Sequence, residues 1–353
     1  MKILMVARRY PPDIRSGTET VFANLYEQAC KHHEVRLVVG YRTSKEGFPP
    51  EAVAVDLRGG GAGQYLKMQR AAVAEARAFQ PDVVLSNSIE IRVPAIPSTV
   101  IVHDLNFGKA GRSAGNVARE LLYLAQGRTM PIVITVSEAS AAALEKIGIP
   151  RKKITMIHNG VDIVRMVPRD PPPSDIVRFA YPSRILAGKG QHVAIDAVGR
   201  LRPDLKKRVH LTIVGAAADP HYLDQLKVQA FNQPVSFAHD VADIVPYYQD
   251  ADAILFPTIM EEGFGFTAVE GMACGKPVIW SDQPAIREAT GGIGLPVPRD
   301  DADALKAAMV KLIEDPALRA RLGREGRQFV EARSWAKVWE RYEAALAGMA
   351  RLQ

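Results

Sequence analysis

With 353 residues, the chain is long enough to form two domains of ordinary size, each with its own core. Its hydrophobic content of 47% and charged content of 24% are typical of a soluble globular protein. No apolar run approaches the roughly 18 residues that a membrane-spanning helix requires. These features exclude an integral membrane protein.

The net charge of +6 is distributed unevenly along the chain. Residues 1–168 contain 22 Lys and Arg against 15 Asp and Glu, whereas the remainder contains 23 against 24. A basic first half indicates an acidic partner such as a phosphate, an anionic lipid or a nucleic acid, although an ordinary solvated surface would also fit. Because basic and aromatic residues do not cluster in a stripe, we expect no nucleic-acid partner.

Two features predict a cytoplasmic protein. The apolar run at residues 1–7 is too short for a signal peptide and leads directly into a strand. The two cysteines, Cys30 and Cys274, are far apart in the sequence and fall in apolar helical surroundings. We therefore expect both to be reduced core residues, and they cannot form a metal site by themselves.

Strands and helices alternate along the first half of the chain. Strands are predicted at 2–7, 35–40, 81–87, 98–103 and 132–136, a strand and turn at 154–160, and helices at 19–31, 64–79 and 138–146. Thr18 and Ser137 are the predicted N-caps of two of these helices. Such alternation indicates a parallel sheet that is covered by helices on both faces.

Residues 165–174 contain four prolines, and this density excludes both a helix and a central strand. We interpret this segment as a linker between domains at 1–168 and 169–334. After it, strands are predicted at 176–181, 209–215, 234–237 and 252–257, and helices at 191–201, 221–229, 266–273, 301–313, 316–330 and 334–349. The last helix has an apolar stripe, so we expect residues of about 335–353 to pack back on the first domain.

The most informative stretch is residues 258–278, in which Glu262 and Glu270 flank a glycine turn before a helix that begins near Phe266. The free N–H groups and the positive dipole at such a helix start suit a phosphate. The two carboxylates can accept hydrogen bonds from two groups of hydroxyls. Together they match the chemistry of a sugar nucleotide, with phosphates between a sugar and a ribose.

A dinucleotide site is the main alternative for this stretch. Gly263, Gly265 and Ala268 fit a dinucleotide fingerprint, and Asp282 follows at the spacing of a ribose-binding acid. Against it, residues 258–262 separate the strand from the first glycine, and two carboxylates would repel a pyrophosphate.

Other candidate residues follow strands. Arg184 and Lys189 lie in a glycine loop after the first strand of the second half, where two cations would neutralise a diphosphate, although solvated surface charges would look the same. His103 ends a strand, where open α/β sheets bind ligands. Asp250 and Asp252 imitate a metal-binding pair of aspartates, but their side chains need not converge, so we expect no metal.

The segment EGFGFTAVEGMACGKPVI at 262–279 resembles the glutamate–seven–glutamate signature of retaining glycosyltransferases of family 4, which have the GT-B fold. Weaker likenesses follow in the family's order at residues 1–7, 16–21, 102–104, 136–137, 158–162 and 183–190. The resemblance implies an α/β protein with two Rossmann-like domains facing each other across a donor-binding cleft. It also implies an acceptor-binding first domain, a donor-binding second domain and a C-terminal helix that crosses back to the first.

The resemblance also implies residue roles. Arg184 and Lys189 would hold the donor diphosphate and stabilise the leaving nucleotide in place of a metal, and Glu262 would bind hydroxyls of the transferred sugar. Glu270 would bind the ribose, and His103 would lie beside the donor sugar and the acceptor. The other donor-binding residues would be Gly17, Ser183, Gly215, Gly263, Phe264, Gly265, Phe266 and Thr267, the last two through backbone N–H groups. No cofactor is expected, and transfer would retain the anomeric configuration.

The resemblance and the charge distribution also indicate substrates. The Glu-Gly-Phe-Gly form of the signature favours GDP-mannose as the donor. The expected acceptor is a glycan or a lipid-linked sugar, and the basic first half favours peripheral contact with an anionic membrane. The family loop usually has paired glycines, whereas this chain has Ser16 and Gly17 at that position. A sugar-nucleotide epimerase of the same fold, an NAD-dependent dehydrogenase and a non-catalytic binding module remain alternatives.

Overall fold

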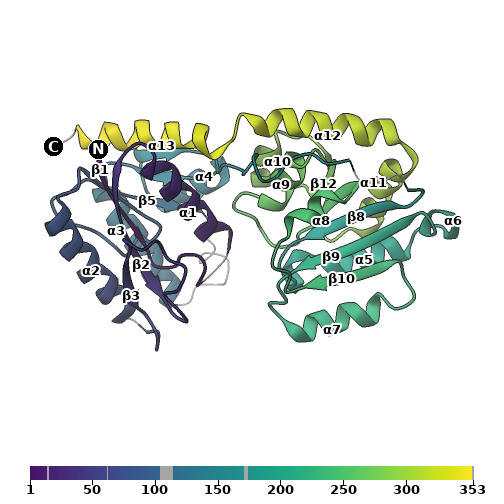
Figure 1. The fold of residues 1–353 in the computed structure, drawn as a ribbon, viewed down its shortest axis with the longest axis horizontal. Helices are drawn as coiled ribbons and strands as arrows, with labels where there is room; N and C mark the ends of the chain where they lie inside the picture. The colour runs from purple at the N-terminus through teal and green to yellow at the C-terminus, as the bar shows by residue number, and fades with distance from the viewer. Residues whose placement is uncertain (14–15, 62, 104–113, 171–173, 352–353) are drawn as a thin grey trace. The chain divides into compact units, whose positions relative to one another are not determined.

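The computed structural model describes residues 1–13, 16–61, 63–103, 114–170 and 174–351, and Figure 1 shows its helices and strands. The chain divides into two compact units. The first contains Met1–Gly160 and Trp335–Gln353, and the second contains Val161–Ser334. The division falls before the proline-rich segment, of which residues 171–173 lie outside the described part.

The first unit is built on a parallel sheet of seven described strands in the order β3-β2-β1-β4-β5-β6-β7. β4 and β5 are buried along their whole length, as expected for apolar strands that are covered on both faces. The strands are β1 (Lys2–Ala7), β2 (Glu34–Tyr41), β3 (Val53–Asp56), β4 (Val83–Ser86), β5 (Ser98–Val102), β6 (Val133–Thr135) and β7 (Ile154–Met156).

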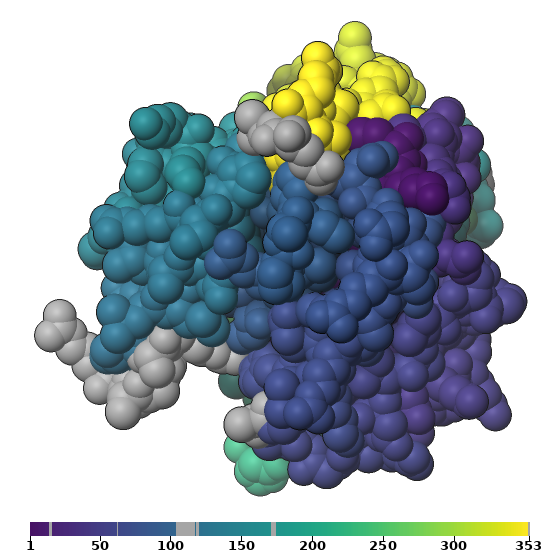
Figure 2. All heavy atoms as spheres, turned by 90° about the vertical axis from the view of Figure 1, so that its left-hand side faces the viewer, coloured from purple at the N-terminus to yellow at the C-terminus, as the bar shows by residue number. Residues whose placement is uncertain are grey.

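The helices of this unit include one from the C-terminal end of the chain. They are α1 (Gly17–Cys30), α2 (Gly63–Phe79), α3 (Ala114–Thr129), α4 (Glu138–Lys146), the 3-10 turn η2 (Arg151–Lys153) and α13 (Trp335–Ala350). α13 packs on α1 and β4, and Figure 2 shows it in yellow against the purple and blue residues of the first unit. Its buried residues are Trp335, Val338, Trp339, Tyr342, Leu346 and Met349, which confirms the predicted stripe.

The second unit repeats this plan with a parallel sheet of six described strands in the order β10-β9-β8-β11-β12-β13. They are β8 (Val177–Pro182), β9 (Val209–Gly215), β10 (Val235–His239), β11 (Ala253–Phe256), β12 (Val278–Ser281) and β13 (Leu295–Val297). In each sheet the first strand of the unit lies beside the fourth, and the strand order reverses there. Ligands of doubly wound sheets bind at this reversal, outside the carboxyl ends of the strands.

Helices surround the second sheet, and the core between them is continuous. They are η3 (Ala187–Lys189), α5 (Gln191–Gly199), α6 (Pro203–Lys206), α7 (Pro220–Gln229), α8 (Val245–Gln249), α9 (Phe266–Ala273), α10 (Pro284–Thr290), α11 (Ala302–Glu314) and α12 (Pro316–Glu331). The predicted bounds of α9 and β9 agree with the structure. The expectation of two α/β units with parallel sheets is confirmed.

Some elements escaped prediction because their sequences carry weak signals. Val53 and Ala54 of β3 are exposed, so no buried apolar run marks this strand. Pro296 interrupts β13, and proline is uncommon in strands. The prediction also omitted the short helices α6 and α10, and α3, which follows residues 104–113 that lie outside the described part.

Two local predictions were wrong. Ser16, and not Thr18, precedes α1, and its hydroxyl donates to Glu19 instead of capping the backbone. Cys30 is exposed, because the last residue of α1 lies beyond the buried side of the helix. Cys274 is buried, as predicted.

Candidate functional site

The centre of the candidate site is an ion pair between two loops. Lys189 lies in the loop after β8, and Glu262 lies in the loop after β11, so the strand-order reversal of the second sheet brings them together. The Lys189 Nζ atom donates to Glu262 Oε1 at 2.5 Å, and the Thr258 hydroxyl donates to the same oxygen at 2.9 Å. The two charged side chains are only 11% and 15% exposed. The fold thus brings two of the predicted site residues, Lys189 and Glu262, into direct contact.

A buried glutamine fixes the backbone of the Glu262 loop. The Gln283 side chain is 4% exposed and lies just before α10. Its amide nitrogen donates to the carbonyls of Thr258 and Met260 at 3.1 and 3.0 Å, and its oxygen accepts from the Glu262 N–H at 3.1 Å. All three hydrogen bonds are made to residues of the same loop. Gln283 therefore stabilises the loop conformation that positions Glu262.

The glycine turn opens α9 as predicted. Gly265 has a φ of +102°, which favours glycine, and Phe264 packs into the core. The Phe266 and Thr267 N–H groups are the first of the helix and therefore have no intrahelical acceptor. The Thr267 hydroxyl donates to the Pro182 carbonyl at 2.9 Å, which ties the helix start to the end of β8. The helix start thus lies beside the loop that carries Arg184 and Lys189, and Gly263 precedes it.

Glu270 lies one turn inside α9. The Tyr248 hydroxyl donates to Glu270 Oε2 at 2.6 Å. Burial raises the pKa of Glu270 to about 7, although the bond from Tyr248 and the charge of Arg165 act in the opposite direction. Near neutral pH this carboxyl group can therefore exist in either protonation state.

The loop after β8 is held by its neighbour after β9. Gly215 has a φ of +145°, and a Cβ atom there would lie 2.1 Å from the Ser183 carbonyl oxygen. The Ser183 N–H donates to the Val214 carbonyl at 2.9 Å. Arg184 is exposed, and its carbonyl accepts from the Gln191 amide at 2.8 Å. Ser183 and Gly215 thus shape the backbone from which the Arg184 side chain extends.

The remaining two predicted residues belong to the first unit. Gly17 is the first residue of α1. His103 follows β5, its carbonyl accepts from the Ser140 hydroxyl at 3.1 Å, and burial lowers the pKa of its imidazole to about 4. The neighbouring Asp104 lies outside the described residues. His103 lines a hollow with Arg8 and Arg9.

The aspartates that imitate a metal-binding pair have separate partners. Asp250 pairs with Arg169, and Asp252 accepts from the Arg178 side chain at 3.1 Å. Within the described ranges, no group of three His, Cys, Asp or Glu residues is placed to hold a metal ion. Lys189 and Arg184 supply positive charge to the described site, and the charge of Arg165 acts on Glu270.

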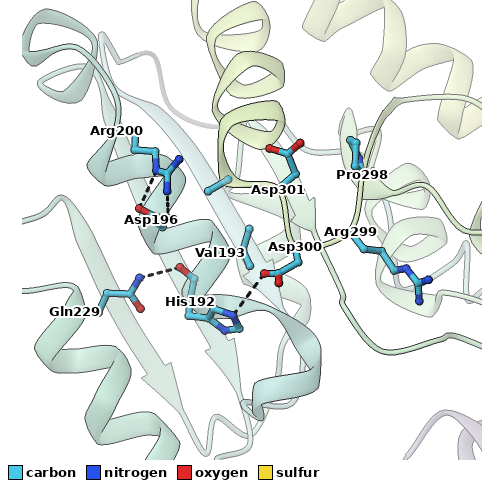
Figure 3. A pocket seen from close by; sticks show the side chains of 10 residues that line it. His192, Val193, Asp196, Arg200, Gln229, Pro298, Arg299, Asp300 and Asp301 are labelled. Carbon is cyan, nitrogen blue, oxygen red and sulfur yellow. Dashed lines mark hydrogen bonds and ion pairs between the residues drawn. The ribbon is translucent and has the colours of Figure 1, made fainter. Parts of the chain in front are cut away.

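A second hollow of about 420 Å³ lies beside α5, and Figure 3 shows its lining. Arg200 pairs with Asp196 at 2.7 Å, and the His192 ring faces Asp300 at 3.9 Å. Arg200 also pairs with Asp303 at 2.6 Å. Since these charges compensate one another, we assign no ligand to this hollow.

Comparisons with known proteins agree with this geometry. A family model described as Glycosyltransferase Family 4 matches residues 15–165, and one described as Glycosyl transferases group 1 matches residues 177–315. The crystal structure of Anabaena HepE in complex with UDP and glucose has a TM-score of 0.81 at 20% identity, covering 99% of this chain and 100% of that one. The chain belongs to the GT-B glycosyltransferases. The predicted fold class is thereby confirmed.

Curated relatives of this glycosyltransferase act on different substrates. Glycogen synthase of Mycobacterium tuberculosis is 29% identical over 71% of this chain. A GDP-mannose-dependent phosphatidylinositol monomannoside mannosyltransferase of Corynebacterium glutamicum is 31% identical over 52% of it. The matches span 65% and 53% of these relatives' own lengths. Neither the epimerase nor the dehydrogenase alternative is favoured by these relatives, and Asp282, the candidate dinucleotide acid, pairs with Arg287 at 2.6 Å.

Among the described helices of this glycosyltransferase, none combines the length and apolar character needed to cross a bilayer.

Sequence reasoning missed the residues that support the charged groups. Gln283 and Tyr248 are lone polar residues, and each is separated by more than twenty positions from the glutamate that it contacts. A signal existed for Gln283, because it follows a buried strand and precedes Pro284, which places a polar side chain at the carboxyl edge of the sheet. Nothing comparable marks Tyr248, whose partner only the fold reveals.

Proposed function

We propose that this protein is a retaining glycosyltransferase of family 4 that transfers a hexose from a nucleotide-sugar donor, without a metal. The observation that carries the proposal is the buried Lys189–Glu262 pair beside the open helix start at Phe266. A cation and free N–H groups suit a diphosphate, and a carboxylate suits sugar hydroxyls. One site therefore offers partners for both halves of a sugar diphosphate.

Each group has a role in this proposal. Arg184 and Lys189 bind the diphosphate together with the N–H groups of Phe266 and Thr267, and Lys189 leaves Glu262 when the donor enters. Glu262 then accepts hydrogen bonds from hydroxyls of the sugar. Glu270, held by Tyr248, accepts from the ribose hydroxyls, which matches its half-buried position in α9.

The reaction breaks the bond between the anomeric carbon and the diphosphate oxygen, and it forms a bond from the acceptor oxygen on the same face of the sugar. The departing phosphate oxygen takes the acceptor proton, so that a nucleoside diphosphate and a glycoside are the products. Negative charge grows on the leaving diphosphate, and Lys189 and Arg184 stabilise it electrostatically. His103 is the proposed neighbour of the donor sugar and the acceptor.

The names of the relatives suggest a donor and an acceptor for this protein. Several relatives are mannosyltransferases, among them the Corynebacterium enzyme and the core lipopolysaccharide mannosyltransferase of Rhizobium leguminosarum, which is 29% identical over 58% of this chain. We therefore propose GDP-mannose as the donor and a glycan or lipid-linked sugar as the acceptor, with the protein in the cytoplasm or at the inner face of the membrane. HepE, with its bound UDP and glucose, makes UDP-glucose the competing donor.

Transfer of labelled sugar tests this proposal. GDP-mannose and UDP-glucose, each labelled in the sugar, are incubated with a cellular glycolipid and glycan extract and either wild type or Glu262→Gln. We expect wild type to transfer label from one donor, and the variant to lose at least about tenfold of that rate because it loses a charged acceptor of sugar hydroxyls. Equal transfer by both proteins would contradict the role of Glu262.

A further inference from the structure

A hollow of about 240 Å³ lies at the strand-order reversal of the first sheet. Arg8 and Arg9 follow β1, Asn87 follows β4, and His103 follows β5. Ser16, Thr18 and Glu19, from the start of α1, complete one side of it. The hollow therefore occupies in the first unit the position that the Lys189–Glu262 site occupies in the second, where doubly wound sheets bind ligands.

Three arginines at this edge have no carboxylate partner among the described residues. Arg8 donates to the Tyr65 hydroxyl at 3.3 Å, and Arg42 donates to the Gln64 side chain at 2.9 Å. The Arg9 guanidinium donates no hydrogen bond within the described ranges, and its Nε atom is buried. Other arginines of the chain, such as Arg200, are ion-paired.

The charge around Arg9 is only partly compensated. Burial and the neighbouring charges of Arg8 and Arg42 lower the pKa of Arg9, whereas Glu19 opposes them. Glu19 is 3% exposed, and its carboxylate already accepts from the Ser16 hydroxyl. One carboxylate therefore faces three guanidinium groups. An anion that entered the hollow would relieve their mutual repulsion.

A second unpartnered group lies in the same hollow. The Nε2 atom of His103 is buried and has no hydrogen-bond partner among the described residues. Buried polar atoms are rarely left unpaired, and such atoms in one cavity indicate a ligand that completes their hydrogen bonds. The hollow thus has two buried nitrogens, from Arg9 and His103, that have no hydrogen-bond partner among the described residues.

We propose that this hollow binds a phosphate group of the acceptor substrate, with Arg9 as its principal contact and Arg8 and His103 as supporting ones. A guanidinium presents paired N–H donors that match phosphate oxygens, and α1 begins at the same edge with its dipole positive. The inference rests on the proposed function, because the donor diphosphate is assigned to the second unit. The acceptor is then a phosphorylated sugar or a phospholipid-linked one.

The test compares phosphate probes on the full-length protein saturated with its nucleoside diphosphate. Wild type, Arg9→Gln, Arg9→Lys and Arg70→Gln are titrated calorimetrically with a hexose phosphate and with the matching hexose. Arg70 is an exposed arginine on α2 and serves as the control. We expect Arg9→Gln to bind hexose phosphate roughly tenfold more weakly than Arg70→Gln. The affinity of Arg9→Lys should lie between them, because lysine keeps the positive charge but lacks the paired N–H donors of the guanidinium.

A parallel arm identifies the source of the phosphate. Sedimentation with phosphatidylcholine vesicles that contain phosphatidylglycerol replaces the hexose phosphate. If Arg9→Gln loses only vesicle binding, the phosphate belongs to a lipid, and if it loses only hexose phosphate binding, the acceptor is a phosphorylated sugar. Both outcomes support the proposal. Equal binding by Arg9→Gln and Arg70→Gln in both arms would overturn it.

The donor serves as the internal reference. We expect Arg9→Gln to bind the nucleoside diphosphate as wild type does, because Arg184 and Lys189 hold it in the second unit. An equal loss of nucleoside diphosphate binding in Arg9→Gln would assign the hollow to the donor and refute the acceptor proposal. If wild type bound hexose phosphate but no nucleoside diphosphate, the proposed function would fail while the phosphate site remained.

Discussion

The Lys189 ammonium lies 2.5 Å from a carboxylate oxygen of Glu262, although the two residues are 73 positions apart in the sequence. The fold brings them together because β8 and β11 are neighbours in the second sheet and both loops leave its carboxyl edge. In the absence of a ligand the two charges neutralise each other. A donor that offers a diphosphate to Lys189 and hydroxyls to Glu262 can replace this pair and leave each group with hydrogen-bond partners.

The pair should be energetically coupled. Lys189→Met should lower the free energy of unfolding by about 1–3 kcal/mol, because Glu262 is then left with the Thr258 hydroxyl as its side-chain partner. The double variant Lys189→Met/Glu262→Gln should recover most of this loss, since neither charge is left alone. Urea unfolding of both single variants and the double variant measures the coupling. A double variant whose loss equals the sum of the two single losses would mean that the pair adds nothing.

Gln283 should matter for the rate more than for the affinity of the donor. Gln283→Leu removes three hydrogen bonds from the Glu262 loop, so we expect kcat to fall at least about tenfold as Glu262 loses its position. The KM of the donor should change less, because Lys189 and the start of α9 are untouched. Gln249→Leu, which removes one bond to the Val167 carbonyl, is the control. Normal kcat in Gln283→Leu would disprove the positioning role.

The carboxyl group of Glu270 should make stability depend on pH. Its pKa in the folded state, about 7, is above the ordinary value of 4.5, so the folded state holds a proton that the unfolded state releases between these values. The free energy of unfolding should therefore fall as pH rises from about 4.5 to about 7 and then level off. In Glu270→Gln this contribution disappears. Urea unfolding of wild type and Glu270→Gln at several pH values tests this prediction. The same pH dependence of the free energy of unfolding in both proteins would contradict it.

Tyr248 should set the midpoint of that titration. Tyr248→Phe removes a hydrogen bond that favours the ionised carboxylate, so the pKa of Glu270 should rise further. Donor affinity, which needs the ionised form to accept ribose hydroxyls, should then reach its plateau at higher pH than in wild type. A nucleotide sugar is the suitable ligand, since its diphosphate carries no terminal phosphate that titrates near pH 6. An unchanged pH midpoint of donor affinity would show that Tyr248 does not influence the pKa of Glu270.

Gly190 should tolerate no side chain. Its φ is +79°, and a Cβ atom would lie 2.4 Å from the Pro257 carbonyl oxygen, so Gly190→Ala should push the Lys189 loop away from β11. Gly292 has a similar φ of +75° with open space around it. Gly292→Ala should therefore cost only the conformational penalty of about 1–2 kcal/mol, and Gly190→Ala clearly more. Equal losses in thermal unfolding would show that the contact with Pro257 is harmless.

The sequence predicts the elements that carry the site because local signals define them. An apolar run ends at Pro257, and Gly265, which has a positive φ, directly precedes α9. The strand, the turn and the helix could therefore all be located from the sequence. The position of Glu270 one turn inside the helix follows from that start. The pairing of Lys189 with Glu262 depends on which strands are neighbours, and no local pattern contains that information.

Side-chain environments were harder to predict than elements. Cys30 belongs to an apolar helix but is exposed, because burial depends on the orientation of its last turn against the sheet. Arg8 and Arg9 were part of a predicted loop, and the basic first half gave only an average charge. Their gathering with His103 requires β1 and β5 to lie in one sheet on either side of β4.

The assignment of Glu262 and Glu270 to a donor site can be tested by calorimetric titration. UDP, GDP, ADP and NAD are titrated, each with and without EDTA, into wild type and Glu270→Ala. We expect that one nucleoside diphosphate binds wild type, that EDTA does not change its affinity, and that Glu270→Ala weakens its binding at least about tenfold. Binding of NAD alone, with equal affinity in both proteins, would contradict it, because Glu262 and Glu270 would then have no part in a donor site.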